Sequence, residues 1–448
     1  MTRPGVTVVG AGIAGLAAAR ALAQAGADVV VVEANERAGG KLETIELDGV
    51  PVDTGPDSFL ARVPHAVALC KELGLGDELV SPAASTAGLW IGGRLQPLPE
   101  GLVLGVPASL SSLTRSSILS PVGVARAALE PLLPRTRWTD DIGVGDLVRR
   151  RFGRQVHERL VDPLLGGINA GRSEELSIKV GAAQLAGVAE RSRSLLLGLR
   201  AQRAATASAA VPGPPAPVFH SLRGGVATLV EALVADLKER GVVIKLGAAV
   251  DRLSDLDTER VVVAVPASAA ASLLGERSPA VATLASGIGT SSVVLTTFVY
   301  DEADFCPPSG WSGFLVPRIE GRLMTACSYG SNKWPHWAAD GRTVLRVSAG
   351  RVGDDRAMAM DDSALVDALR RELTECLGVT AEPVLTRVRR WDEGFPQLRP
   401  GHLRLMSQVR EALAVDAPSI AVAGAWTGGV GIPTCIASGQ AAAAAVLA

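Results

Sequence analysis

The chain has few cysteines and histidines and no block of like charge, and each shortage excludes a class of protein. Its five cysteines include no C-x-x-C pair and its five histidines are dispersed, so we expect neither a disulfide framework nor a metal site. The 44 lysines and arginines nearly balance the 46 aspartates and glutamates, whereas a nucleic-acid binder normally carries a basic stripe. We therefore expect no nucleic-acid partner and a reducing, cytoplasmic setting.

Long uninterrupted hydrophobic runs are also missing. Arg20, Gln24 and Asp28 break the apolar N-terminus before it reaches membrane-spanning length, and it ends in a strand-like run rather than a cleavage site. Residues 101–203 show helical patterns, such as Val122–Leu133 and Val180–Leu199, that are too interrupted to span a bilayer. We interpret them as a helical insertion and as a candidate for peripheral docking on the cytoplasmic face of a membrane.

The length of the chain allows two or three domains, because 48% of its 448 residues are hydrophobic and a large core can be buried. The first residues predict strand, helix and strand at Val6–Val9, Ile13–Ala25 and Val29–Val32. We predict an α/β fold in which a Rossmann-like dinucleotide-binding domain is interleaved with a sheet-based substrate domain and the helical insertion. The predicted boundaries are 1–80, 219–267 and 388–448 for the dinucleotide-binding domain, 81–100 and 268–387 for the substrate domain, 101–203 for the insertion and 204–217 for a mobile Ala/Pro loop.

The strongest local signal is the glycine-rich turn between the first strand and helix. Gly10 allows a tight turn, Gly12 lets a pyrophosphate approach the backbone, and Gly15 lets helix and strand pack closely. The helix N-terminus adds free N–H groups and the positive end of its dipole. Glu33 ends the second strand, where a carboxylate accepts hydrogen bonds from ribose hydroxyls. The unit predicts a dinucleotide site, and a glycine turn without a ligand is the weaker alternative.

Two motifs after this unit indicate which dinucleotide cofactor the chain binds. Residues 33–41 read E-x-x-x-R-x-G-G-K, which resembles the extended fingerprint of the amine oxidase-like flavoproteins, whose arginine and glycine pair lie against the FAD diphosphate. Residues 53–59 read D-T-G-P-D-S-F, which resembles the protoporphyrinogen/coproporphyrinogen oxidase family, in which this turn lies beside the flavin ring. Outside this context the two segments would be interpreted as surface turns. The resemblance implies that the first domain binds FAD, without a covalent link.

Further matches to that family continue to about residue 446. The Gly167–Gly171 turn resembles an element that borders the substrate pocket of the family. Val250 matches a residue that packs on the adenine end of FAD, and Trp391 matches a residue near the flavin ring. Residues 423–436 resemble the G-x-G-[IL]-x-x-C-[IV] turn ahead of the final helix. The N-terminal dipole of that helix would stabilise anionic reduced flavin.

The chain also departs from the family pattern. Leu398 stands where the family usually has Tyr, and Thr434 stands where Asp is common. In plant and animal members a cation before a W-x-G strand binds a substrate propionate. Thr86 and Ala87 occupy that region here, so recognition of a propionate must use other groups. We interpret Cys435 as a small buried thiol and not as a flavin attachment site.

The resemblance implies two sets of binding residues. The cofactor-binding residues are Gly10, Ala11, Gly12, Ile13, Ala14, Gly15, Glu33, Ala34, Arg37, Gly40, Lys41, Gly55, Pro56, Asp57, Ser58, Val250, Trp391, Ala425, Val430, Gly431 and Ile432. The substrate-binding residues are Gly167, Ile168 and Asn169, with Arg172 and Lys333 as further candidates. We nominate no catalytic side chain, because aromatisation supplies the driving force and the protein need only hold the macrocycle at the flavin.

The function that the resemblance implies is FAD-dependent oxidation of a porphyrinogen in heme biosynthesis. The Gly429–Pro433 turn looks like that of the Gram-positive branch, which favours oxidation of coproporphyrinogen III to coproporphyrin III in three two-electron steps with O2 as acceptor. Protoporphyrinogen IX remains the alternative substrate, and other heme-pathway enzymes are candidate partners. An amine oxidase would need an aromatic cage around the amine, and the chain has only two tyrosines. A non-enzymatic porphyrin carrier is the third alternative.

Overall fold

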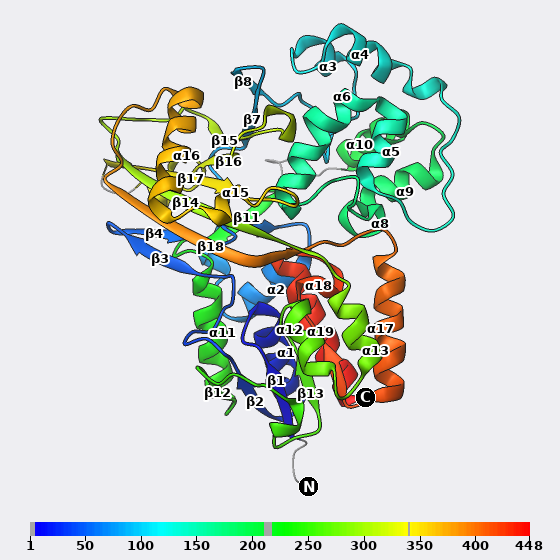
Figure 1. Cartoon of the computed structure of the whole chain (residues 1–448), viewed down its shortest axis with the longest axis vertical. Helices are drawn as coiled ribbons and strands as arrows, with labels where there is room; N and C mark the ends of the chain where they lie inside the picture. The colour runs from blue at the N-terminus through cyan, green and yellow to red at the C-terminus, as the bar shows by residue number, and fades with distance from the viewer. Residues whose placement is uncertain (1–4, 210–216, 339–340) are drawn as a thin grey trace. The chain divides into compact units, whose positions relative to one another are not determined.

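The structure is a computed structural model that describes residues 5–209, 217–338 and 341–448 (Figure 1). The chain forms two compact units. Unit 1 comprises Met1–Pro82, Pro217–Gly289 and Leu403–Ala448, and unit 2 comprises Ala83–Ala216 and Thr290–His402. Each unit is therefore assembled from segments far apart in the sequence, as expected for interleaved domains.

Unit 1 is built on a five-stranded sheet in the order β12-β2-β1-β13-β19, in which all neighbouring strands are parallel. Val6 and Val8 of β1 pack on one face with helices α1, α11 and α19, whereas Val9 packs on the other face with α12, α13 and α17. Because both faces are covered, the strands are rich in valine and other apolar residues. The elements of the sheet and its helices are β1 (Gly5–Val9), α1 (Ile13–Gln24), β2 (Asp28–Val32), α11 (Ala227–Glu239), β12 (Val243–Lys245), β13 (Val261–Val263), α12 (Ala267–Leu274), α13 (Pro279–Ser286), α17 (His402–Asp416), β19 (Ile420–Val422), α18 (Ala425–Gly428) and α19 (Ile432–Leu447).

Smaller elements complete unit 1. A hairpin of β3 and β4 and a small antiparallel sheet in the order β5-β11-β6 lie outside the main sheet. Their bounds are β3 (Thr44–Leu47), β4 (Val50–Asp53), β5 (Phe59–Leu60), α2 (Pro64–Glu72), η1 (Gly76–Glu78), β6 (Leu79–Val80), β11 (Phe219–Leu222) and η4 (Leu253–Asp255).

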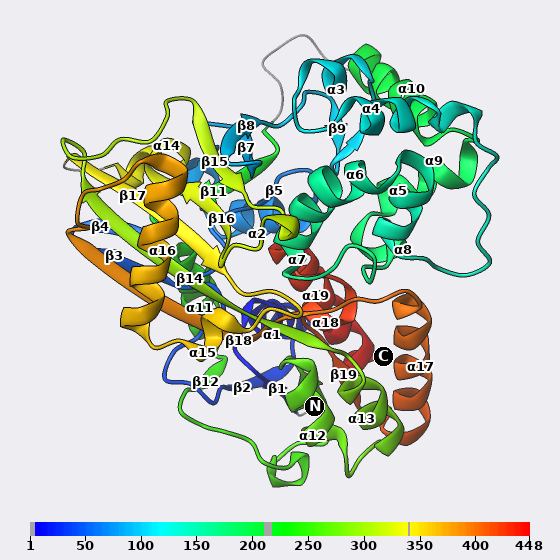
Figure 2. The ribbon, with the colours of Figure 1, turned by 45° about the horizontal axis from the view of Figure 1, so that its top comes forward.

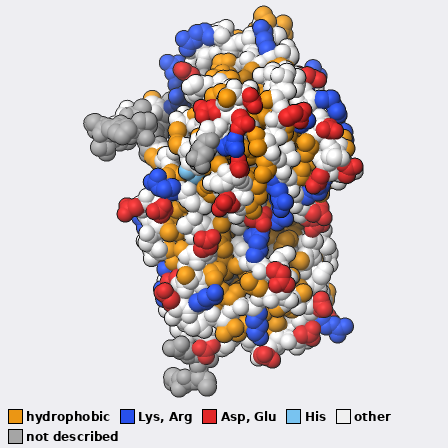
Figure 3. Space-filling view, turned by 90° about the vertical axis from the view of Figure 1, so that its left-hand side faces the viewer, with side chains coloured by type: hydrophobic (Ala, Val, Ile, Leu, Met, Phe, Trp, Pro, Cys, Tyr) orange, Lys and Arg blue, Asp and Glu red, His pale blue; other side chains and the backbone are white. Residues whose placement is uncertain are grey.

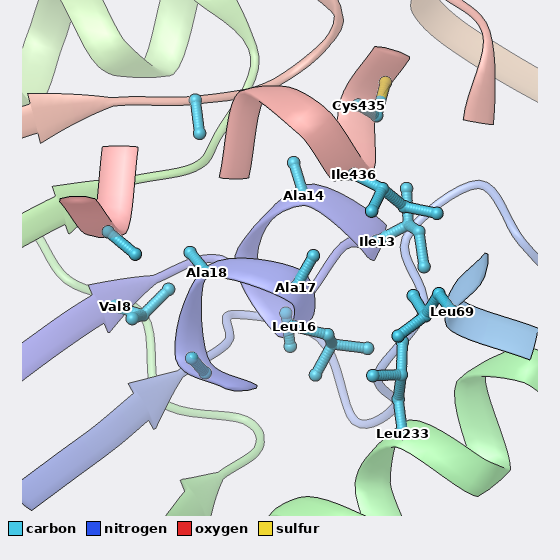
Figure 4. Packing of buried hydrophobic residues seen from close by; sticks show 14 of the residues in the cluster. Val8, Ile13, Ala14, Leu16, Ala17, Ala18, Leu69, Leu233, Cys435 and Ile436 are labelled. Carbon is cyan, nitrogen blue, oxygen red and sulfur yellow. The ribbon is translucent and has the colours of Figure 1, made fainter. Parts of the chain in front are cut away.

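Helices α1 and α19 approach each other unusually closely. A Cβ on Gly439 of α19 would lie 2.0 Å from the carbonyl oxygen of Ala14 in α1. Figure 4 shows the side chains of the two helices packed together, with Ile13 beside Ile436. The contact holds the C-terminal helix against the first helix of the chain, which also follows the glycine-rich turn.

Unit 2 contains a seven-stranded mixed sheet in the order β18-β14-β17-β16-β15-β7-β8. Its neighbours are antiparallel except for the parallel pair β15 and β7. Helix α16 covers one face (Figures 1 and 2) and buries Leu365, Leu369 and Leu373, which are spaced four residues apart. The elements are β7 (Thr86–Ile91), β8 (Arg94–Pro97), β9 (Leu102–Val103), β10 (Val106–Pro107), β14 (Thr290–Asp301), β15 (Trp311–Leu315), η5 (Arg318–Glu320), β16 (Met324–Tyr329), α14 (Gly330–Lys333), η6 (Pro335–Trp337), β17 (Arg342–Ala349), α15 (Arg356–Ala359), α16 (Asp362–Leu377) and β18 (Leu385–Pro396).

The predicted helical insertion forms a second core in unit 2. Its helices gather in one group in both ribbon views and bury a common apolar cluster that includes Leu147, Leu160 and Leu185. Their bounds are α3 (Ser111–Arg115), α4 (Pro121–Ala128), η2 (Glu130–Leu132), α5 (Val144–Phe152), α6 (Arg154–Val156), the π-helix η3 (His157–Gly166), α7 (Gly167–Asn169), α8 (Ile178–Gly181), α9 (Ala183–Arg191) and α10 (Leu195–Ala209).

The structure differs from the sequence-based expectation at three places. Residues 388–402 were expected in the first domain, but β18 pairs with β14 in the sheet of unit 2. Residues 268–289 were expected in the second domain, but α12 and α13 pack on the sheet of unit 1. The expected loop at 204–217 is helical up to Ala209, because alanine has the highest helix propensity; residues 210–216 lie outside the described part of the chain.

The surface mixes charges of both signs. On the face that Figure 3 displays, basic and acidic side chains are interspersed with apolar ones, which agrees with the balanced composition. Among the described residues, no helix is long and apolar enough to cross a membrane.

Candidate cofactor and substrate site

The glycine-rich turn of unit 1 uses its three glycines in different ways. Gly10 has φ +101°, and a Cβ there would lie 2.7 Å from the carbonyl oxygen of Ala264. A Cβ on Gly15 would lie 1.9 Å from the oxygen of Gly10. Both positions therefore need glycine for folding. A Cβ on Gly12 would meet no heavy atom within 4 Å, so this glycine leaves space above the turn.

That space lies at the start of α1. Gly12 is the N-cap of α1, no side chain caps the helix, and its first turn contains no acidic residue. The first backbone N–H groups of a helix have no partner within the helix and carry its positive dipole end. Open space over such an uncapped N-terminus suits a pyrophosphate.

Glu33 holds the turn together from the end of β2. Its side chain is buried, and its Oε2 accepts the N–H of Ala11 at 2.7 Å. Its Oε1 accepts the backbone N–H of Asn35 at 2.9 Å and the side-chain amide at 2.6 Å. Since a carboxylate accepts about four hydrogen bonds, these three leave room for one ribose hydroxyl.

The 33–41 segment folds back onto the glycine-rich turn. Gly39 donates its N–H to the oxygen of Ala11 at 2.8 Å, and a Cβ on Gly40 would lie 3.2 Å from the Cα of Gly12. Arg37 donates to three carbonyl oxygens of its own segment at 2.6–3.3 Å and pairs with Glu43 at 3.0 Å. In this structure the guanidinium of Arg37 stabilises the turn. Its contact with the FAD diphosphate remains a prediction.

A buried aspartate at its start holds the 53–59 segment in place. Asp53 is 1% exposed, and its Oδ1 accepts the hydroxyl of Thr44 at 2.6 Å and the N–H of Val226 at 2.9 Å. Ser58 donates to Asp57 at 2.9 Å. Asp53 therefore ties the Gly55–Ser58 turn to the β3–β4 hairpin and to the start of α11.

The C-terminal glycine segment leads into α19. Gly424 and Gly429 have φ values of +123° and +145°, a backbone conformation that only glycine adopts readily. Between them, Trp426 is 1% exposed and donates its ring N–H to the oxygen of Val265 at 3.1 Å, so it is a structural residue. Helix α19 then begins after Gly431, again with no side-chain cap and no acidic residue in its first turn.

Unit 1 brings most of the predicted cofactor residues together. Cys435 in α19 is buried, which raises the pKa of its thiol to about 11, and Lys41 is near enough to oppose that shift. Ala248 donates its N–H to the oxygen of Glu33 at 2.8 Å, which brings the segment of Val250 beside the end of β2. The remaining predicted residues, Trp391 and the Gly167–Asn169 turn, belong to unit 2.

In unit 2, the Gly167–Gly171 turn follows the π-helix η3 and contains α7 (Figure 2). Ala170 has φ +46°, and a left-handed conformation costs a non-glycine residue about 1–2 kcal/mol. Both π-helical turns and backbone strain occur often at functional sites. Ile168 stands out from the turn with 53% of its surface exposed.

Hydrogen bonds from three segments that follow strands of the unit 2 sheet hold this strained turn. Gln397 donates to the oxygen of Asn169 at 3.0 Å, and Arg318 donates to the oxygen of Gly171 at 3.1 Å. Val352 donates its N–H to the oxygen of Ala170 at 2.8 Å. Sequence reasoning missed all three donors, because their contacts with the turn join segments far apart in the chain.

Trp391 and strand β7, two other features singled out from the sequence, also belong to unit 2. The guanidinium of Arg389 lies 4.4 Å from the ring centre of Trp391, a cation–π contact. Strand β7 begins with Thr86 and Ala87, reads TAGLWI and contains no lysine or arginine. A Cβ on Gly88 of β7 would lie 2.3 Å from the ring of Trp311, so the indole occupies this part of the sheet.

The chain is similar to known proteins over almost its whole length. The profile of the flavin containing amine oxidoreductases matches residues 13–447. Coproporphyrinogen III oxidase of Bacillus subtilis (strain 168) is 34% identical, with 98% of this chain and 96% of the relative covered. The enzyme of the same name from Staphylococcus aureus (strain NCTC 8325 / PS 47) is 29% identical, with 99% of both chains covered.

Solved structures agree with these relatives. A crystal structure from Exiguobacterium sp. 255-15, provisionally described as a protoporphyrinogen oxidase, superposes with a TM-score of 0.89 at 30% identity, covering 100% of this chain and 99% of that chain. Cyclohexylamine oxidase from Brevibacterium oxydans IH-35A has a TM-score of 0.67 at 19% identity, with 99% and 98% covered. The second likeness shows the fold alone.

The residues of unit 1 fit FAD, the flavin cofactor of the flavin containing amine oxidoreductases. The space over Gly12 and the uncapped start of α1 would receive its diphosphate, and Glu33 its ribose. The start of α19 would face its negatively charged groups. The sequence match over the whole chain and the geometry of this site lead to the same assignment: the chain belongs to the flavin containing amine oxidoreductases and, within them, to the coproporphyrinogen III oxidase family.

Proposed function

We propose that this chain oxidises coproporphyrinogen III to coproporphyrin III in heme biosynthesis, with O2 as the electron acceptor. The observation that carries the proposal is the 34% identity to the Bacillus subtilis coproporphyrinogen III oxidase over 98% of the chain. The conversion removes six hydrogens from a flexible macrocycle, so a two-electron cofactor completes it in three cycles. Each cycle that ends on O2 releases one hydrogen peroxide.

FAD, when bound, supplies the redox chemistry by accepting a hydride equivalent and passing two electrons to O2. The chain contributes position and electrostatics. The uncapped starts of α1 and α19 offer N–H donors and positive dipole ends to negative charge. In unit 2, the hydrogen bonds from Gln397, Arg318 and Val352 fix the Gly167–Gly171 turn against which the substrate would lie. Within the insertion, Asn169 also donates to the oxygen of Leu165 at 2.9 Å. Because aromatisation drives the reaction, no strong side-chain base is required.

The experiment that tests this function is aerobic incubation of the purified yellow protein with colourless coproporphyrinogen III. The expected result is fluorescent coproporphyrin with three hydrogen peroxides formed per porphyrin. Protein from which FAD has been removed is the matched control and should form porphyrin no faster than buffer does. Flavin-containing protein that also fails to exceed buffer would refute the proposal and favour a porphyrin carrier.

Two alternatives rest on weaker observations. The chloroplastic protoporphyrinogen oxidase of Nicotiana tabacum is 28% identical over 96% of this chain, which keeps protoporphyrinogen IX as a second candidate substrate. Amine oxidase activity rests on structures at 15–19% identity, which share the fold alone. Benzylamine or putrescine should therefore leave the flavin of this protein oxidised under anaerobic conditions.

We also infer a cytoplasmic protein that touches membranes peripherally. The support is three exposed apolar side chains on the insertion: Val122, Leu129 and Leu132 are 77%, 51% and 71% exposed. Apolar residues at a surface can enter the interface of a bilayer without spanning it. Sedimentation with anionic liposomes should be lost when the three residues are changed to Ser. Equal sedimentation of the triple variant would contradict the inference.

A further inference from the structure

Arg351, two residues after the end of β17, is a buried cation whose side chain donates no hydrogen bond to the residues that the structure describes. It is 8% exposed, and its Nε is enclosed. Among the described residues its side chain pairs only with Asp354, whose carboxylate oxygen lies 3.9 Å from Nε. An unsatisfied buried polar group costs about 1–3 kcal/mol, and more when it is charged. Such a cost suggests that a ligand supplies the missing acceptor.

Several charged groups surround Arg351. Arg318 and Arg356 are the cations whose charges act on it, and Asp354 and Asp162 are the anions. Burial, followed by the neighbouring charge of Arg318, lowers the pKa of Arg351. Arg172 adds a further positive charge near Arg318, and one of its terminal nitrogens would lie 3.0 Å from a Cβ on Gly353. Four arginines therefore lie near two aspartates and Glu174, whose charge also acts on Arg318.

Both aspartates already have closer partners. Asp354 is held by two hydrogen bonds of 2.8 Å from Arg356. Asp162 accepts the N–H and the hydroxyl of Ser173 at 3.0 and 2.9 Å, and lies 3.9 Å from Arg318. The aspartates thus balance part of the charge without satisfying Arg351.

A metal ion is a poorer occupant of this region than an anion. His157, Asp162 and Glu174 place one ligand atom each within 4.8 Å of one another. However, Glu174 pairs with Arg149 at 3.5 Å, and Asp162 faces Arg318. The cations that already neutralise these carboxylates would repel a second positive charge.

The cluster adjoins the turn assigned to the substrate. Arg318 donates to Gly171 at 3.1 Å and to Val352 at 3.0 Å, and Val352 donates its N–H to Ala170. Arg351 directly precedes Val352 in the chain. All of these residues belong to unit 2. An anionic group that reached Arg351 would therefore lie next to the Gly167–Gly171 turn.

We propose that Arg351, with Arg318 and Arg172 beside it, binds a carboxylate arm of the substrate next to the Gly167–Gly171 turn. This rests on the proposed function, because a porphyrinogen with four propionates is the anion that the protein would meet. Arg351 supplies N–H donors that lack an acceptor, and a carboxylate accepts two parallel hydrogen bonds from one guanidinium.

The test compares Arg351→Met with the wild type and with Arg370→Met, which removes a cation of α16 paired with Glu382 on the surface of the same unit. For Arg351→Met we expect KM for coproporphyrinogen III to rise about tenfold or more with kcat within about twofold, the size of one charge-assisted hydrogen bond. Arg370→Met should match the wild type, and Arg351→Lys should recover part of the loss. The melting temperature of Arg351→Met should be unchanged or higher, because an unsatisfied buried charge is removed.

Binding of the product separates recognition of a carboxylate from a structural role. Coproporphyrin III, followed by its fluorescence, should bind Arg351→Met about tenfold more weakly than the wild type. Its tetramethyl ester has the same macrocycle without anionic groups and should bind both proteins equally. An unchanged KM, equal loss of acid and ester binding, or a drop in melting temperature would overturn the proposal. Failure of the wild type to oxidise coproporphyrinogen III would instead refute the proposed function.

Discussion

Replacing Gly12 by Val separates folding of unit 1 from binding of its cofactor. Gly12 has φ −68° and ψ 171°, which any residue adopts, and a Cβ there meets no heavy atom within 4 Å. The substitution should therefore leave the apo-protein folded while the isopropyl group fills the space assigned to the diphosphate. Gly15→Ala differs in kind, because its Cβ would lie 1.9 Å from the oxygen of Gly10 and must displace backbone.

The expected loss in free energy of unfolding differs between the apo-protein and the FAD-bound protein. Gly12 is the N-cap of α1, and apolar residues are poorer N-caps than glycine by about 1 kcal/mol; the apo-protein should lose about that much free energy of unfolding. A cofactor present at 100 times its Kd stabilises a protein by about 2.7 kcal/mol. The holo-protein should lose this contribution in addition, because the variant no longer binds FAD.

The assay is the ratio of flavin absorbance to protein after desalting, together with melting of the apo and reconstituted forms. We expect colourless Gly12→Val protein whose melting temperature does not respond to added FAD. Gly5→Val is the matched control, since a Cβ on Gly5 also meets no heavy atom within 4 Å, and it should remain yellow. Stoichiometric flavin in Gly12→Val would refute the assignment of the N-terminal site.

Three further predictions concern the thiol of α19 and two carboxylates of the insertion. Burial raises the pKa of Cys435 to about 11, so the thiol is protonated at neutral pH; acid precipitation should release all flavin, and flavin in the pellet would indicate a covalent link. The contact with His157, whose Nε2 lies 3.6 Å from a carboxylate oxygen, lowers the pKa of Glu174 from 4.5 to about 2, so its stabilisation should be complete above about pH 4.5 and lost as the pH falls toward 2; Glu174→Gln should flatten acid unfolding in this range, and an unchanged profile would contradict the assignment. Glu130→Ala leaves the 3%-exposed Arg151 without its buried partner and should cost about 3–5 kcal/mol in urea unfolding; a loss below about 1 kcal/mol would show that water replaces the carboxylate.

The N-terminal βαβ unit was predictable because its signals are local. Runs of valine, three glycines at fixed spacing and an acidic residue at the end of β2 lie within the first 33 residues. The predicted strand at Val29–Val32 agrees with β2 to within one residue. Each glycine acts through its own backbone geometry, so no distant contact was needed to interpret it.

Features that depend on distant contacts were not predictable. The predicted helix Val122–Leu133 ends at Ala128 and is followed by a 3-10 turn at Glu130–Leu132, because Pro131 cannot continue an α-helix. The predicted helix Val180–Leu199 is divided among α8, α9 and α10. The position of β18 in unit 2 depends on pairing with a strand about 90 residues earlier, which single-sequence periodicity does not encode.

In the predicted substrate site, too, local motifs were predictable and contacts between distant segments were not. Motifs indicated the Gly167–Gly171 turn, but the donors that hold it, Gln397 and Arg318, come from segments more than 140 residues away. Arg351 carries no motif at all. Its candidacy comes from burial and a missing acceptor, which are properties of the folded chain.

The most direct test of the proposed activity is kcat/KM for coproporphyrinogen III and protoporphyrinogen IX, measured with the same protein, detergent and oxygen concentration. A substrate with four carboxylates gains from an arginine cluster more than a substrate with two, and one additional charge-assisted hydrogen bond changes specificity about tenfold. We predict a preference for coproporphyrinogen III of about tenfold or more. Equal values, or a preference for protoporphyrinogen IX, would contradict the assignment of the substrate.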